Sequence, residues 1–229
     1  MKKRTYLTCL LFIVNITLQG GRPITKEDIV NLKFVSSPTM DPKGENVCYV
    51  LSVPRTDEEK PGPRHSQIWV KRTNDQHPVQ FTSSAYDSYF PQWTSDGRGI
   101  TFLSNRKVLS EHTQLFYIPI DGGEASLFLE HSAGIGHYSW SPDGKWLAFL
   151  STDTLSFEKK KAIEKGYDML VKDKYHRYQR LWLHNISTGK TELIFKNDIH
   201  VHDFIWSDDN KTIIFQGTRT PGADPSLMD

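Results

Sequence analysis

Cysteine is almost absent from this chain. Only Cys9 and Cys48 occur among 229 residues, and Cys9 lies in an apolar N-terminal stretch. Once that stretch is removed, a single cysteine remains, and it cannot form an internal disulfide. Stability must then come from a large hydrophobic core, which a chain of this length can build. Cys48 lies in the strand-like run NVCYVLS, where we expect a buried and unreactive thiol.

An excess of one charge is also lacking. The formal net charge is +1, which argues against a nucleic-acid binder with a broad basic surface. The sequence shows no phosphate-binding glycine loop and no zinc-type cysteine cluster. Its longest apolar stretch, Tyr6 to Leu18, is shorter than the ~20 residues of a membrane-spanning helix. We therefore expect no cofactor, no metal, no nucleic-acid partner, and no membrane contact beyond the leader.

The N-terminus has the layout of a secretory signal peptide. In MKKRTYLTCLLFIVNITLQGG, basic residues precede an apolar stretch that ends in small residues. We expect residues 1–21 to be this signal and the mature protein to be exported, either periplasmic or secreted. An uncleaved anchor is the alternative.

A repeated motif occupies most of the remaining chain. The stretch YSWSPDGKWLAFLS at 138–151 has counterparts at 38–51, 91–104 and 204–217. The four copies align without gaps on an anchor position, namely Met40, Trp93, Trp140 and Trp206. Four positions later stand Gly44, Gly97, Gly144 and Asn210, and nine positions later Tyr49, Phe102, Phe149 and Phe215.

The glycine column has a physical reason. A tight turn between two strands needs one residue at positive φ, which glycine adopts freely and asparagine tolerates. Asp96, Asp143 and Asp209 precede three of these positions and favour the turn, whereas Lys43 precedes the first. The run WLAFL at 146–150 is apolar throughout, which fits a strand with other sheets packed on both faces.

The first three hairpins are each followed by a second pair of strand signals, such as TQLFYIPIDGGE and ASLFLE. Four strands in a repeat of ~40–50 residues are typical of a β-propeller blade. We expect an all-β fold, a partial propeller of about three and a half four-stranded antiparallel blades. The propeller would span 22–229, with blades near 36–84, 85–132, 133–198 and 199–229. A short helix is expected in the insertion of the third blade, between Ser156 as cap and Gly166 as end.

The motif resembles a known family. WSPDGKWLAFLS, followed by LW and STGK, is similar to the N-terminal propeller of the prolyl oligopeptidase family of serine peptidases, in its acylaminoacyl- and dipeptidyl-peptidase-like branch. The opening GGRPITKEDIVNLKFVSSPTMDPKGENVCYV resembles the start of those propellers. The hairpin itself also resembles the repeats of TolB-type propellers. The resemblance implies a propeller that admits peptides to a C-terminal α/β-hydrolase domain carrying a Ser-His-Asp triad.

One departure from that family concerns the catalytic residues. The Gly-x-Ser-x-Gly elbow that carries the family's nucleophile is not found in this sequence. We therefore assign no catalytic residue and expect the propeller part of a longer exported peptidase. Its partners would be the hydrolase domain and peptide substrates. A non-enzymatic TolB-like propeller that binds proteins and a propeller lyase using channel residues are the alternatives.

Several polar residues are candidates for substrate contact. The first strand of a propeller blade borders the central channel, where Asp87, His200 and His202 would face a passing peptide. Arg177 and Arg180, at the end of the insertion, are suited to a substrate carboxylate or carbonyl. Structural roles are the competing interpretation: the two histidines as polar lining rather than a metal pair, and the two arginines in ordinary ion pairs.

Overall fold

The computed structural model describes residues 22–83, 86–106, 112–155, 157–167 and 177–221. Residues 1–32 and 33–229 are two separate units. The first contains the helix α1 (Lys26–Val30), which begins with a capping box between Thr25 and Asp28. No helix among the described residues is long and apolar enough to cross a membrane. The expected signal peptide lies outside the described residues.

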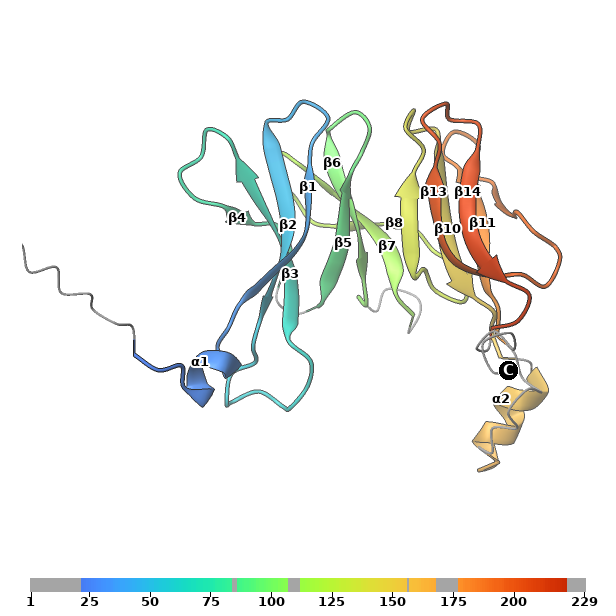
Figure 1. Ribbon diagram of the computed structural model, residues 1–229, viewed down its shortest axis with the longest axis horizontal. Helices are drawn as coiled ribbons and strands as arrows, with labels where there is room; N and C mark the ends of the chain where they lie inside the picture. The colour runs from blue at the N-terminus through green and yellow to red at the C-terminus, as the bar shows by residue number, and fades with distance from the viewer. Residues whose placement is uncertain (1–21, 84–85, 107–111, 156, 168–176, 222–229) are drawn as a thin grey trace, which may run out of the picture. The chain divides into compact units, whose positions relative to one another are not determined.

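The second unit is built from antiparallel sheets, each formed by consecutive strands (Figure 1). The first sheet contains β1 (Phe34–Met40), β2 (Asn46–Val53), β3 (His65–Arg72) and β4 (Val79–Gln80). The second contains β5 (Ser88–Trp93), β6 (Gly99–Ser104), β7 (Gln114–Pro119) and β8 (Ser126–Leu129). The third contains β9 (His137–Trp140), β10 (Trp146–Thr152), β11 (Gln179–Asn185) and β12 (Thr191–Leu193). The fourth contains β13 (His200–Trp206) and β14 (Ile213–Thr218).

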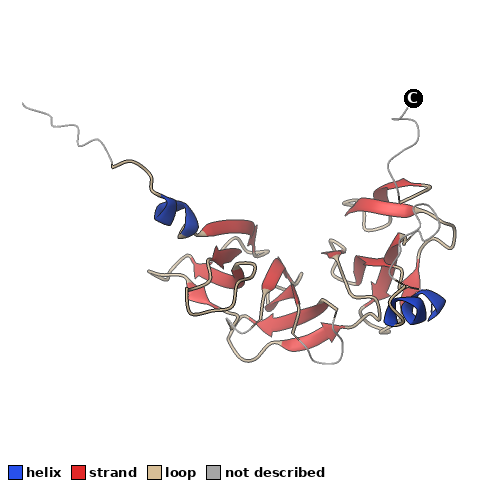
Figure 2. Ribbon diagram, turned by 90° about the horizontal axis from the view of Figure 1, so that it is seen from below, coloured by secondary structure: helices blue, strands red, loops and turns tan. Residues whose placement is uncertain are grey.

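The expected all-β architecture is confirmed, with sheets of four, four, four and two described strands. Figure 2 shows how strands dominate the described chain. The insertion of the third sheet contains the helix α2 (Phe157–Glu164), close to the helix expected there. Gly166 follows it at φ 83°, as a helix-ending glycine does. Ser156, the expected cap, lies outside the described residues.

The turn column has the backbone conformation that glycine favours. The φ angles are 74° at Gly44, 68° at Gly97, 68° at Gly144 and 59° at Asn210. Asn210 has a second role, because its side-chain oxygen accepts a hydrogen bond of 2.7 Å from the backbone N–H of Asp143. Turns of neighbouring sheets therefore touch each other.

An aspartate orders each turn, but the first repeat places it differently. Asp143 Oδ1 accepts from the backbone N–H of Lys145 at 3.1 Å, and Asp209 makes the same bond to Lys211. In the first repeat Lys43 stands where these aspartates stand. There Asp41, two residues earlier, accepts from the backbone N–H of Glu45 at 2.8 Å. An acid at another position thus supplies the same bond and offsets the departure.

The core lies between successive sheets. β6 is buried along its whole length, and β10 is buried from Leu147 to Ser151. Side chains alternate between the two faces of a strand, so each of these strands serves two cores. Phe102 packs toward the first sheet and Leu103 toward the third. Phe149 packs toward the second sheet and Leu150 toward the fourth. Each such side chain contributes about 1.5–3 kcal/mol on burial.

The anchor tryptophans join each sheet to the preceding one. Their indole N–H groups donate across the interface: Trp93 to the carbonyl of Thr39 at 3.1 Å, Trp140 to Oγ1 of Thr101 at 3.0 Å, and Trp206 to the carbonyl of Ser139 at 3.1 Å. Met40, the anchor of the first repeat, is 59% exposed. The anchor is therefore tryptophan at each of the three positions with a described sheet before it.

Two glycine-to-alanine variants separate the backbone requirement from the packing of neighbouring turns. A Cβ at Gly97 would lie 3.5 Å from Cδ of Pro42, whereas a Cβ at Gly144 would overlap Oγ of Ser95. Both variants lose about 1 kcal/mol or more of folding stability, because alanine is strained at positive φ. We expect Gly144→Ala to lose more stability in urea unfolding than Gly97→Ala. Equal losses would show that the turns do not constrain each other.

Replacement of Trp206 by phenylalanine tests the cross-sheet hydrogen bond. The variant keeps an aromatic ring but removes the indole donor to the carbonyl of Ser139, and we expect a loss of about 1 kcal/mol in unfolding free energy. Trp146→Phe is the matched control, because the indole N–H of Trp146 makes no hydrogen bond to the described residues. A loss of the same size in both variants would assign the effect to ring volume.

Candidate functional site along the first strands

The first strands of the sheets, β1, β5, β9 and β13, each form one edge of their sheet. β1 contacts β5, and β9 contacts β13. The side-chain amide of Gln92 in β5 donates to the carbonyl of Tyr138 in β9 at 2.8 Å. The first strands of successive sheets therefore lie beside one another, as the first strands of propeller blades do around a channel.

Three of these strands contain an irregularity. The pairing register shifts between Ser36 and Thr39 in β1, between Tyr89 and Gln92 in β5, and between Val201 and Asp203 in β13. In β1 and β5 the bulge includes a non-glycine residue at φ 50°, namely Ser37 and Phe90. Bulges redirect side chains and are frequent beside functional sites.

A cavity of about 520 Å³ opens along β1, β5 and β9. Three repeats contribute the anchor and the position before it, namely Thr39 and Met40, Gln92 and Trp93, and Ser139 and Trp140. The lining also includes Pro38, Pro42, Pro91 and Pro142. The wall is rich in proline and aromatic rings, and serine and threonine side chains supply polar groups. Such a wall is suited to apolar parts of a flexible ligand.

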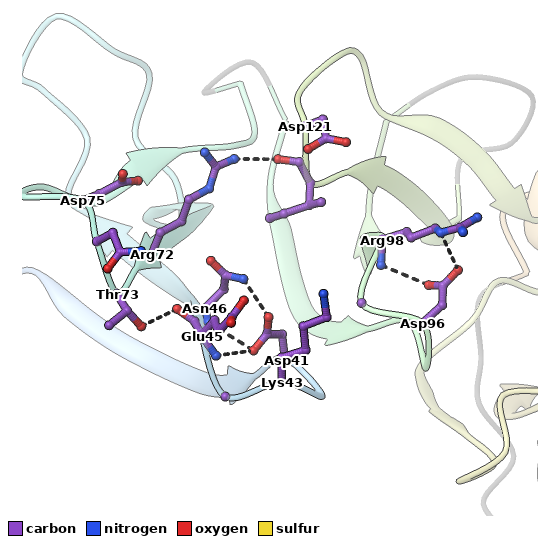
Figure 3. A pocket seen from close by; sticks show the side chains of 14 residues that line it. Asp41, Lys43, Glu45, Asn46, Arg72, Thr73, Asp75, Asp96, Arg98 and Asp121 are labelled. Atoms are coloured by element: carbon purple, nitrogen blue, oxygen red, sulfur yellow. Dashed lines mark hydrogen bonds and ion pairs between the residues drawn. The ribbon is translucent and has the colours of Figure 1, made fainter.

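A larger cavity of about 870 Å³ lies among the turns of the first two sheets (Figure 3). Several of its charged side chains are engaged locally. Arg72 donates to the carbonyl of Ile120 at 2.8 Å, and Arg98 lies 3.8 Å from Asp96. Burial disfavours the charged form of Asp41, but hydrogen bonds from Asn46 and its neighbours outweigh this and hold its pKa below the ordinary value. These groups mainly order the turns.

Asp87 and His200 make equivalent ties between sheets. Each stands six positions before the anchor tryptophan of its repeat. Oδ1 of Asp87 accepts from the backbone N–H of Ser66 in β3 at 3.0 Å, and Nδ1 of His200 accepts from that of Gln179 in β11 at 3.1 Å. Burial, and the neighbouring His202, lower the pKa of His200, which favours the neutral ring that can accept this bond.

The two histidines lie together on β13. The ring centroids of His200 and His202 are 4.8 Å apart, and Nε2 of His202 lies 3.3 Å from Oγ1 of Thr218. No group of three or more metal-ligating side chains occurs among the described residues. Contact of these histidines with a substrate stays a prediction.

The two arginines have different surroundings. Arg180 pairs with Asp153 at 2.8 Å and with Asp198 at 3.0 Å, and its guanidinium lies over the ring of Tyr178. The Asp153 hydrogen bond in particular raises the pKa of Arg180. Arg177 donates one bond of 2.9 Å to the carbonyl of Asp153 and is otherwise exposed. Arg180 thus holds the insertion to the third sheet, while substrate contact by either residue stays a prediction.

The structure brings together three residues that sequence reasoning did not single out. Phe90, His137 and Asp203 each stand three positions before the anchor of their repeat. The rings of Phe90 and His137 are 6.0 Å apart, and Nε2 of His137 lies 3.8 Å from Oδ1 of Asp203. The alignment on the anchor contained the signal for this grouping, because equal positions on neighbouring first strands lie side by side.

Two curated relatives align with most of the chain. It is 27% identical over 219 residues to the uncharacterized peptidase YuxL of Bacillus subtilis, covering 89% of this chain and 32% of that protein. It is 24% identical over 232 residues to dipeptidyl-peptidase 5 of Porphyromonas gingivalis, covering 90% of this chain and 33% of that protein. The chain thus spans about a third of the length of these relatives. No family model matches it.

The fold is shared with a solved peptidase structure. The acylaminoacyl peptidase of Pyrococcus horikoshii superposes with a TM-score of 0.52 at 16% identity, covering 82% of this chain and 33% of that one. At 16% identity this likeness shows a shared fold only. The evidence for common descent is the sequence similarity to the two curated relatives. The chain is therefore a relative of these peptidases, and its sheets form part of a propeller, as the resemblance to the prolyl oligopeptidase family predicts.

Proposed function

We propose that the chain is the substrate-gating propeller portion of an exported serine peptidase of the prolyl oligopeptidase family. The observation that carries this proposal is the alignment of two peptidases with about nine tenths of the chain. The aligned region is about a third of the length of each peptidase. In this proposal the Ser-His-Asp triad belongs to a hydrolase domain outside residues 1–229. The propeller holds peptides near that domain and excludes folded proteins by size.

The geometry of the first strands supports a role in holding peptides. The cavity beside β1, β5 and β9 presents proline and aromatic surfaces, which suit apolar side chains. Edge strands also carry backbone N–H and C=O groups that can pair with an extended segment. An unfolded peptide offers both kinds of partner, whereas a folded protein has its backbone groups already paired.

The first test concerns catalysis by the 229-residue chain. We expect it to bind unstructured peptides without cleaving them, because no Gly-x-Ser-x-Gly nucleophile occurs in its sequence. Fluorogenic peptides report turnover, and a serine-directed phosphonate with a mass readout reports a reactive serine. A known serine peptidase assayed in parallel is the positive control. Turnover that the phosphonate blocks would overturn the proposal that the triad lies elsewhere.

The second test concerns export. We propose that residues 1–21 direct secretion and are then removed. N-terminal sequencing of the protein recovered outside the cytoplasm of an expressing host should begin near residue 22. A variant with Lys2, Lys3 and Arg4 replaced by glutamate serves as the control and should remain inside. An intact Met1 in the membrane fraction would support the anchor instead.

A further inference from the structure

The position three residues before the anchor has φ 50° both in β1, at Ser37, and in β5, where a bulky aromatic residue occupies it. Phe90 has φ 50°, and 46% of its surface is exposed. Positive φ is rare for a bulky side chain and costs about 1–3 kcal/mol. Because the ring is only half-buried, its packing within the sheet offsets little of that cost. Because Ser37 shares this φ in β1, the bulge itself sets the backbone. What distinguishes β5 is a half-exposed aromatic ring at a position where β1 has a small residue.

Phe90, His137 and Asp203 form a row across the second, third and fourth sheets, with Phe90 at one end. Its ring meets the edge of the His137 ring at a centroid distance of 6.0 Å. On the other side, Nε2 of His137 lies 3.8 Å from Oδ1 of Asp203, which is too far for a direct hydrogen bond. The ring of Phe204 is buried, and its centroid lies 5.3 Å from that of the His137 ring. Phe204 therefore supports the imidazole from the side of the core. The row therefore rests on the core between the third and fourth sheets.

The row combines an aromatic surface with an accessible carboxylate. The side chain of Asp203 is 67% exposed and that of His137 is 36% exposed. Oδ1 of Asp203 also accepts from the backbone N–H of Phe204 at 2.8 Å, which fixes the direction of the carboxylate. Aromatic faces attract organic cations, and a carboxylate forms charge-assisted hydrogen bonds with them. An ammonium or guanidinium group fits this combination better than an anion or a neutral side chain.

We propose that Phe90, His137 and Asp203 form a subsite for the cationic side chain of a lysine or arginine in a bound peptide. The inference rests on the proposed function, because it assumes that peptides lie along the first strands. Pro91, which follows Phe90, lines the adjoining 520 Å³ cavity, so a peptide residue next to the basic one has an apolar surface within reach. The subsite then favours peptides in which a basic residue adjoins an apolar one.

Calorimetric titration of the chain with matched peptides tests the subsite. The peptides are N-acetylated and C-amidated, and they differ only in carrying lysine or norleucine at one central position. We expect the lysine peptide to bind about tenfold more tightly, as a partly exposed cation site of this kind would give. Asp203→Asn should abolish that preference. Asp208→Asn removes an equal charge from an exposed turn of the same sheet and should keep it.

A second variant separates binding from folding. Phe90→Gly relieves the positive φ, so the melting temperature should not fall, yet the lysine preference should decrease. Equal binding of both peptides, unaffected by Asp203→Asn, would overturn the subsite and leave the proposed function standing. Failure of both peptides to bind would count against the proposed function itself.

Discussion

Burial of the central strands on both faces is the constraint on which the rest of this structure depends. In the part of the chain that the structure describes, no single sheet encloses a core of its own, because the apolar residues of β6 and β10 alternate between two neighbouring sheets. Phe102 is buried only because the first sheet covers it, and Leu150 only because the fourth does. Stability is thus a property of adjacent pairs of sheets, as in other repeat architectures.

The turns and the anchors give this stacking a defined register. A hydrophobic face alone permits sliding, but the indole N–H of Trp206 must reach the carbonyl of Ser139. Gly144 must also leave room for Ser95 in the preceding turn. The same positions that shape each hairpin therefore align it with its neighbour. Asn210, which stands where the other repeats have glycine, both shapes its turn and aligns it with the neighbouring turn. It adopts positive φ, and its side-chain oxygen accepts a hydrogen bond from the backbone N–H of Asp143.

That register also determines the surface presented along the first strands. Positions at equal distance from the anchor are brought side by side, which assembles Phe90, His137 and Asp203 from segments far apart in sequence. Asp87 and His200 occupy another such position, where they accept backbone hydrogen bonds from the preceding sheet. One position of the repeat thus makes hydrogen bonds between sheets, and another carries the side chains of the proposed subsite.

The sequence by itself determined the hairpins, the turn positions and the class of fold, because positive φ, strand burial and repeat length are local requirements that residue types reveal. It also determined that Cys48 is buried, where burial raises the pKa of its thiol to about 12. Only the tertiary structure decided which polar residues form hydrogen bonds and ion pairs with other segments of the chain. The ion pairs of Arg180 with Asp153 and Asp198 became visible only in the folded chain, and so did the ring contact between Phe90 and His137. The physical reason is that hydrogen bonds and ring contacts between sheets join residues dozens of positions apart, and residue type does not specify such partners.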